Sequence, residues 1–491
     1  MKPNKAPRNA PGNVNSWHQF AAQMGSKLLP FADAASDKLP LGRLLRLALF
    51  QVSVGLAVVL LTGTLNRVMI IELGVPTWLV ALMVALPLVF APLRALIGFR
   101  SDHYVSALGW RRVPFVWFGT LLQFGGLAIM PFALLVLSGD THGPIVYGQL
   151  GAGLAFLLLG AGMHISQTAG LALATDLASE EQRPQVVALL FVMLLIGMFF
   201  SALIFGWLLT DFSQLRLIKV IQGAAMITLA LNLFALWKQE PRNREITRPD
   251  RPRPPFRQAW AELTADGRAV RLLVAVGLGT FGFAMQDILL EPFGGEVLGL
   301  SVSATTVLTA LFALGTLAAF AAAAKALRIG IDPHRLAGYG ALAGVLAFAI
   351  LTLVTVLHWP NLFRAGVTLV GFGAGLFAVG TMTAAMKLAN NDGQASTTQN
   401  GLALGAWGAV QATAAGLAVA AGGGAKDLVS AMATDGSLGS AMTTSGSGYS
   451  AVYQFEILLL FITLVVIGPL ARHSGTPLRD DETVGLAEIP N

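Results

Sequence analysis

Residues 46–66 read RLALFQVSVGLAVVLLTGTLN, a mainly apolar stretch that is long enough to cross a membrane. A membrane-spanning helix needs about 20 such residues, because roughly 30 Å of hydrocarbon must be crossed at about 1.5 Å per residue. The apolar run Leu56–Leu61 argues against a strand of a membrane barrel, in which apolar and polar residues alternate. The stretch is therefore predicted to be a transmembrane helix.

Eleven more segments share this character, so the sequence predicts twelve spans. They lie near residues 46–66, 77–97, 114–137, 145–174, 184–209, 217–237, 271–290, 303–325, 335–357, 362–386, 400–422 and 451–471. Hydrophobic residues make up 55% of the 491-residue chain and charged residues 12%, about half the charged share of an average soluble domain. The predicted fold class is an all-α polytopic membrane protein.

The basic residues indicate how the spans are oriented. Of the 32 Lys and Arg residues, 27 fall on the side of the membrane that carries both termini. The opposite side holds five, which are Arg67, Arg216, Lys219, Arg364 and Lys426. Because basic loops stay in the cytoplasm, both termini are predicted to be cytoplasmic. The net charge of +6 therefore reflects topology, and no nucleic-acid partner is expected.

The chain divides into two sets of six spans. Residues 239–270 begin with five prolines among many arginines and are expected to form a cytoplasmic linker. The predicted parts are a cytoplasmic N-terminal segment at 1–45 (an interfacial helix or a partly ordered tail), bundles at 46–238 and 271–471, and a cytoplasmic tail at 472–491. A Gly- and Ser-rich stretch at 422–450 is expected to be a flexible outer loop. Two six-helix bundles are typical of transporters built from repeats.

The loop between spans two and three carries a familiar pattern. It reads Gly98-Phe99-Arg100-Ser101-Asp102, followed by Gly109-Trp110-Arg111-Arg112. This resembles the loop signature of the major facilitator superfamily, although the second Gly arrives about four residues late. Asp102, Arg111 and Arg112 are expected to hold one conformation of the bundle on the cytoplasmic side. The alternative is a solvated loop with ordinary positive-inside charge.

Three further motifs are more specific. They are MQDILLEPFG at 285–294, HISQTAGLALATD at 164–176, and GWRRVP at 109–114 with GTLLQFGG at 119–126. Together they resemble the PucC-type family, the bacteriochlorophyll-delivery proteins of photosynthetic bacteria and a branch of the major facilitator superfamily. The resemblance extends over roughly residues 41–471, and so over both halves of the chain.

The resemblance implies an assembly factor for light-harvesting antenna complexes that handles bacteriochlorophyll, nascent antenna polypeptides or both. Bacteriochlorophyll is the implied non-covalent cofactor. The implied partners are antenna polypeptides, the reaction centre–antenna complex, pigment-synthesis enzymes and membrane lipids. The implied location is the bacterial inner membrane, in its intracytoplasmic photosynthetic form.

Three residues are candidates for pigment contact: His164, Gln167 and Trp407. His164 lies twelve residues before Asp176, which places it about 18 Å along the helix and near the bilayer midplane. A neutral imidazole can ligate the magnesium of a chlorin, whereas the alternative is an interhelical hydrogen bond to Ser166, Gln167 or a polar group elsewhere. Trp407 lies among Gly and Ala residues that either pack helices closely or leave a flat face for a macrocycle.

Charged residues also occupy the outer ends of spans one and seven. Arg67 is predicted to pair with one or both of Asp287 and Glu291, which are four residues apart and share one helix face. Such a pair closes the outer side of the protein. The alternative is three separate interfacial charges, each solvated.

No enzymatic activity is expected from this chain. It has no cysteine, seven scattered histidines, and no phosphate-binding glycine loop with a following Lys, so the sequence predicts no metal cluster and no ATP or other nucleotide site. The alternative function is a secondary transporter of a small or lipid-like solute, coupled to protons or sodium. Such a transporter generally has ionisable groups around a midplane cavity, where this chain offers His164 and few others.

Overall fold

The computed structural model describes residues 39–89, 109–139, 144–179, 182–241, 267–390, 397–435, 437 and 446–473. Asp102, most of the predicted linker and nearly all of both terminal segments lie outside these ranges. Within them the secondary structure is entirely helical. The predicted all-α membrane fold is therefore confirmed.

The described residues of the first half of the chain form six membrane helices. The first is long and begins at Leu41, five residues before the predicted span, and it contains two π-helical segments on the way to Glu72. The elements are α2 (Leu41–Val58), η2 (Val59–Thr64), α3 (Leu65–Arg67), η3 (Val68–Glu72), α4 (Thr77–Val89), α6 (Val113–Leu137), α7 (Ile145–Leu177), α8 (Arg183–Leu208) and α9 (Gln214–Leu236).

The described part of the second half supplies six more, and the first of these is broken by a 3-10 segment in its distal half. The elements are α11 (Gly267–Ala284), η5 (Met285–Ile288), α12 (Leu290–Glu296), α13 (Val302–Arg328), α14 (Pro333–Leu357), α15 (Pro360–Asn390), α16 (Thr397–Thr434) and α17 (Ser447–His473). Ten helices in the described ranges are long and apolar enough to cross a membrane, and the described part of α4 is a shorter apolar helix. With α16, every predicted span corresponds to a helix.

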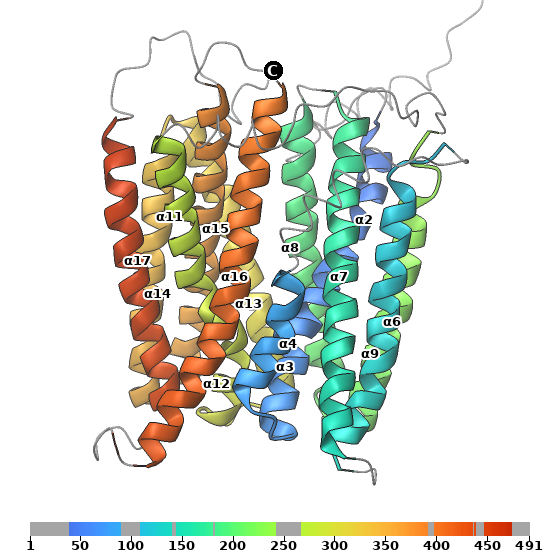
Figure 1. Cartoon of the computed structure of the whole chain (residues 1–491), viewed down its shortest axis with the longest axis vertical. Helices are drawn as coiled ribbons and strands as arrows, with labels where there is room; N and C mark the ends of the chain where they lie inside the picture. The colour runs from blue at the N-terminus through green and yellow to red at the C-terminus, as the bar shows by residue number, and fades with distance from the viewer. Residues whose placement is uncertain are drawn as a thin grey trace, which may run out of the picture.

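The helices form two bundles that lie side by side (Figure 1). In one bundle α2 packs on α7, α8 and α9, and α6 packs on α7; in the other α14 packs on α15 and α17, and α11 on α17. Helix α4 runs along α16 and α8 along α13, which joins the bundles. We call the side where α2 begins and α17 ends the terminal side (top in Figure 1), and the opposite side the distal side.

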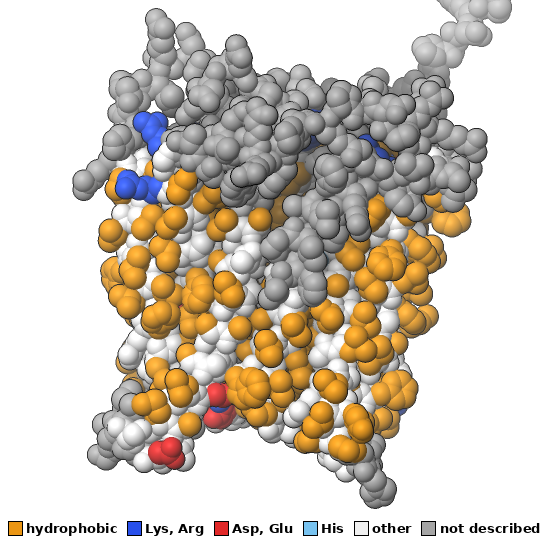
Figure 2. Space-filling model, in the orientation of Figure 1, with side chains coloured by type: hydrophobic (Ala, Val, Ile, Leu, Met, Phe, Trp, Pro, Cys, Tyr) orange, Lys and Arg blue, Asp and Glu red, His pale blue; other side chains and the backbone are white. Residues whose placement is uncertain are grey.

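The surface between these two sides is apolar. Figure 2 shows hydrophobic side chains over the helices, with acidic side chains at the distal edge of this face. On α17, the exposed residues Phe455, Leu458, Ile462 and Val465 recur at helical spacing and form one face. Apolar exposure of this extent and length is what a lipid environment requires, so the protein is a multi-pass membrane protein.

Glycine residues let the two bundles approach closely. A Cβ atom at Gly416 would lie 2.8 Å from the Cβ of Leu88, and one at Gly423 would lie 3.1 Å from the carbonyl oxygen of Thr77. Small residues are used in this way wherever membrane helices pack backbone to backbone. The prediction of a flexible loop from residue 422 is wrong as far as Thr434, because this part of α16 is helix packed against α4.

Candidate functional site

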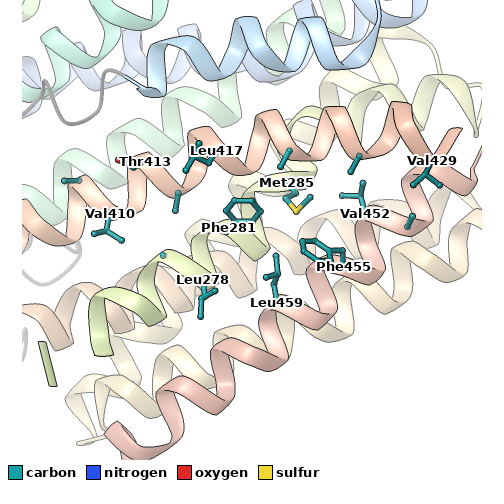
Figure 3. A pocket seen from close by; sticks show the side chains of 16 residues that line it. Leu278, Phe281, Met285, Val410, Thr413, Leu417, Val429, Val452, Phe455 and Leu459 are labelled. Carbon is teal, nitrogen blue, oxygen red and sulfur yellow. The ribbon is translucent and has the colours of Figure 1, made fainter. Parts of the chain in front are cut away.

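An apolar groove of about 950 Å³ lies between α11, α16 and α17 (Figure 3). Helices α16 and α17 meet on the distal side, where a Cβ atom at Gly448 would lie 2.5 Å from the carbonyl oxygen of Lys426. They diverge toward the terminal side, and α11 forms the floor between them. Sixteen residues line the groove: Gly277, Leu278, Phe281, Met285, Ala409, Val410, Thr413, Ala414, Leu417, Ala421, Ala425, Val429, Ala451, Val452, Phe455 and Leu459.

The groove opens on the apolar exterior of the bundle. Leu417 and Phe455 line it and are also 56% and 45% exposed. Phe455 belongs to the outward face of α17 described above, which is the face suited to lipid. A hydrophobic molecule in the membrane therefore has lateral access to the groove.

The lining determines what the groove can bind. Of the sixteen residues only Thr413 has a polar side chain. A sugar or an ion would lose its hydrogen bonds to water there without replacement, at a cost of several kcal/mol. The volume lies near the upper end of small-molecule sites, which span roughly 300–1,000 Å³. The groove suits a large apolar ligand that offers one or a few hydrogen-bonding groups.

The predicted pigment residues lie elsewhere. His164, on α7, is 7% exposed and belongs to the first bundle. Near it, Ser166 Oγ accepts a hydrogen bond from Gln123 Nε2 of α6 at 3.0 Å, and Gln167 Nε2 donates to Gln51 Oε1 of α2 at 3.5 Å. These side chains join α7 to its neighbours within the bundle.

Trp407 lies in the other bundle and is also bonded to a neighbouring helix. Its indole Nε1 donates to Thr381 Oγ1 of α15 at 3.1 Å, and its ring packs against the cluster that contains Leu272 and Leu470. Helix α16 thus directs Trp407 away from the groove, whose lining does not include it. The structure does not bring His164, Gln167 and Trp407 together, and a role for them in pigment binding stays a prediction.

Arg111 and Arg112 connect the start of α6 with the end of α7. Both guanidinium groups bind the carboxylate of Asp176, at 2.6 Å from Arg111 and 3.0 Å from Arg112. These contacts lie within one bundle, on the terminal side. Whether they control a conformational change together with Asp102, which lies outside the described residues, stays a prediction.

Glu240 caps the same helix end. Its carboxylate accepts hydrogen bonds from three backbone N–H groups, those of Arg111 at 2.7 Å, Arg112 at 3.0 Å and Val113 at 2.8 Å. Its neighbour Gln239 is fully buried and accepts a hydrogen bond from Arg43 Nε. Residues 239 and 240, where the predicted linker begins, therefore satisfy polar groups of the first bundle.

Arg67 does not pair with Asp287 or Glu291. Its ion pair is with Glu72, and its Nη2 donates to the carbonyl oxygen of Leu300 at 3.2 Å. The predicted ion pair is wrong because η3 is a π-helix. Hydrogen bonds in a π-helix join residues five apart, so Glu72 lies beside Arg67 on the same face.

The two carboxylates are bonded within the second bundle instead. Glu291 Oε1 accepts a hydrogen bond from Thr309 Oγ1 of α13 at 2.6 Å, and Glu291 is 3% exposed. Asp287 Oδ1 accepts one from Gln286 Nε2 at 2.5 Å. The sequence correctly placed both acids near the distal end of span seven but did not identify these partners.

Other polar residues join the bundles on the distal side. Lys426 Nζ lies 3.3 Å from Thr77 Oγ1 of α4 and 3.3 Å from Glu296 Oε2, while Asp427 Oδ2 accepts the backbone N–H of Trp78 at 2.7 Å. Thr64 and Thr306 hydroxyls add a 3.3 Å contact between η2 and α13. We call this set the distal interface; its members are Thr64, Thr77 and Trp78 in one bundle and Thr306, Lys426 and Asp427 in the other.

Sequence reasoning missed Lys426 and Asp427 because they fall in the stretch interpreted as a loop. The sequence nevertheless contains a feature that points to these two residues. Lys426 is one of only five basic residues on the distal side, and it lies in a run of Gly and Ala next to an acid. A charged pair inside a small-residue segment indicates a buried contact rather than a solvated loop.

Comparisons with known proteins agree with the sequence motifs. Residues 64–475 match the family described as "PUCC protein". The chain is 57% identical over 414 residues to "Protein PucC" of Rhodovulum sulfidophilum, covering 83% of this chain and 90% of that one. It is 54% identical over 469 residues to an "Uncharacterized protein in puhA-bchM intergenic region" of Rhodobacter capsulatus, covering 94% and 97%.

Solved structures agree on the fold. A bacterial homolog of the human lysosomal transporter Spinster, in an inward-facing conformation, aligns over 88% of this chain and 96% of that one. The TM-score is 0.64 and the sequence identity 14%. A likeness at this identity shows the fold alone, and it confirms the predicted two-bundle architecture of the major facilitator superfamily.

Proposed function

Since the chain belongs to the PUCC family, we propose that it is an assembly factor for bacterial light-harvesting antenna complexes. In this proposal it binds or delivers bacteriochlorophyll, nascent antenna polypeptides or both within the membrane. It acts without catalysis of its own and without ATP. Its location is the inner, intracytoplasmic photosynthetic membrane, with the terminal side in the cytoplasm, as the distribution of basic residues favours.

The observation that carries the proposal is the lateral groove. A pigment with a long hydrocarbon tail resides in the bilayer, so a site for it needs an opening toward lipid and an apolar lining. The groove between α11, α16 and α17 offers both, in a volume of about 950 Å³. The single hydroxyl of Thr413 supplies a hydrogen bond to a polar group on the ring or its substituents.

Deletion of the gene tests the assembly function. We expect a deletion strain, with no related protein present, to contain less antenna complex while still synthesising bacteriochlorophyll. Absorption spectra of membranes and of extracted pigment measure the two quantities separately. Normal antenna levels in that strain would contradict the proposal.

Purification tests the pigment-binding part. The protein isolated in mild detergent is expected to carry far-red-absorbing pigment in a stoichiometric amount, antenna polypeptides, or both. Preparations from a strain that cannot make bacteriochlorophyll provide the control for bound polypeptide. A preparation with neither partner would contradict this part of the proposal.

A second candidate is a secondary transporter of a lipid-like solute. The likeness of the fold to solved transporters favours it, as do the carboxylates buried in the spans near the break of α11. Uptake or release of solute by vesicles that contain the purified protein distinguishes the two functions. Transport that depends on a proton or sodium gradient, together with normal antenna assembly in the deletion strain, would select the transporter.

A further inference from the structure

Three acidic side chains lie inside the membrane-spanning part of the second bundle, around the break that separates α11 from α12. They are Asp287 and Glu291 on the broken helix and Glu456 on α17. Glu456 is fully buried, Glu291 is 3% exposed and Asp287 is half-buried. Burying an ionisable side chain within the membrane costs free energy, and such residues usually mark an ion or proton site.

The break supplies some of the donors that these acids need. The backbone N–H of Gln286 donates to Glu456 Oε1 at 2.8 Å, because the short 3-10 segment leaves this group without its helical partner. Glu291 Oε1 accepts from Thr309. The second oxygen of each acid, Glu291 Oε2 and Glu456 Oε2, is buried and has no hydrogen-bond partner among the described residues.

None of these acids is paired with a positively charged side chain of the described residues. Within the described residues no ion pair joins Asp287, Glu291 or Glu456 to a Lys or Arg, and Arg67, whose field reaches Glu291, is paired with Glu72. The described residues also contain no group of three or more His, Asp or Glu side chains that could hold a metal ion. An ionised carboxylate here would carry the desolvation cost of burial without a compensating charge. A bound proton removes that cost.

Glu291 also lies at the boundary between the two bundles. Its carboxylate abuts Gly63 of η2, where a Cβ atom would lie 2.9 Å from Thr309 Oγ1 and would collide with Glu291 itself. Thr64, a member of the distal interface, is next to Gly63 in sequence, and its hydroxyl contacts that of Thr306 of α13 at 3.3 Å. A charge on Glu291 would therefore appear between two packed surfaces, where only separation of the bundles admits water.

We propose that Glu291 is a proton-binding site, and that its protonated form keeps the distal interface closed. Loss of the proton leaves a charge that favours hydration and separation of the distal halves of the bundles. The titratable and charged groups near it are Asp287 on its own helix, Arg67 with Glu72 on the first membrane helix, and, beyond Asp287, Glu456 on α17. This inference does not depend on the proposed role in antenna assembly.

Distances between the bundles test the proposal. The chain has no cysteine, so Leu215→Cys and Leu357→Cys introduce the only labelling sites. Both leucines are exposed at the distal end, on α9 of one bundle and α14 of the other. Pulsed electron resonance on the spin-labelled protein in lipid vesicles is expected to show a longer-distance population that grows as the pH rises between about 5 and 9.

Variants assign the effect to Glu291. Glu291→Gln keeps the shape without the charge and is expected to abolish the pH-dependent shift, whereas Asp211→Asn, at an exposed distal site, keeps it. Gly63→Ala is expected to increase the longer-distance population at every pH, and Gly125→Ala, where a Cβ meets nothing within 4 Å, is its control.

Three results would overturn the proposal. They are a wild-type distribution that does not change with pH, a Glu291→Gln variant that shifts as the wild type does, and a shift caused at constant pH by replacing choline with sodium. The last would assign the site to a sodium ion.

Discussion

At the scale of single residues, the groove depends on one hydroxyl for polar recognition. The side chains of Thr and Val have nearly the same shape, so Thr413→Val removes the hydroxyl while keeping the shape of the groove. We expect pigment retention by the purified protein to fall about 5- to 10-fold, the equivalent of one hydrogen bond worth about 1–1.5 kcal/mol. Retention is measured as far-red absorbance per protein after washing in detergent. Unchanged retention would mean that the ligand makes no use of this hydroxyl.

His164 provides the companion test at the same scale. If its imidazole ligates a chlorin magnesium, His164→Leu shifts or removes the far-red band while the protein stays folded. The side chain is buried in the first bundle and separate from the groove, so a second pigment would be involved. An unchanged band and an unchanged pigment ratio would assign His164 to packing between α7 and its neighbours.

Glu240 is predicted to matter for stability rather than for ligand binding. Its carboxylate accepts three backbone N–H groups at the start of α6, which otherwise have no helical partner. Glu240→Ala should lower the free energy of unfolding by about 1–2 kcal/mol, as loss of a helix cap does. Asp211→Ala, whose carboxylate is 86% exposed, should change it by less than about 0.5 kcal/mol. Equal effects in the thermal unfolding of the two variants would contradict the capping role.

At the scale of elements, α16 uses two faces: one lines the groove, and the other packs against α4. Ala414, Leu417 and Ala421 line the groove, while Gly416 and Gly423 contact α4 of the other bundle. A larger side chain on the second face must push the bundles apart, because the atoms it meets belong to a packed helix.

Adjacent glycines of α16 make this testable with a matched pair. A Cβ at Gly423 meets Ala81 and the backbone of Thr77, whereas one at Gly424 meets nothing within 4 Å. Gly423→Leu is expected to destabilise the protein by about 1–3 kcal/mol through overpacking and to lengthen the spin-label distance across the distal interface. Gly424→Leu is expected to leave the distance unchanged. The same distance in both variants would show that the α4–α16 contact is not close-packed.

Predictability from sequence also differs among elements. Hydropathy located the ten apolar helices of the described residues, since lipid requires long apolar segments whatever they pack against. It misjudged residues 422–434, because Gly and Ser suit both a loop and a closely packed helix, and only the partner helix decides between them. The π-helical turns that place Glu72 beside Arg67 leave no periodic signal in sequence, so the wrong partner was predicted for that arginine.

At the scale of the whole molecule, motifs identified the family and the spans identified the fold, but neither located the groove. Its existence depends on the angle at which α16 diverges from α17, a property of packing that no single segment encodes. The predicted pigment residues are polar or aromatic groups in the membrane-spanning segments, whose chemistry suits a chlorin. The groove was not found in that way because its lining looks like any lipid-facing surface.

The measurement that tests the central claim most directly is antenna content in a strain whose groove is filled. Ala414→Phe places a ring in the groove, and Ala349→Phe places the same ring on an exposed face of α14. Each variant replaces the wild-type gene, with protein levels matched by immunoblot. We predict that Ala414→Phe lowers antenna absorbance to the level of the deletion strain, while Ala349→Phe keeps the wild-type level. Wild-type antenna absorbance in the Ala414→Phe strain would contradict the claim that the groove carries the function.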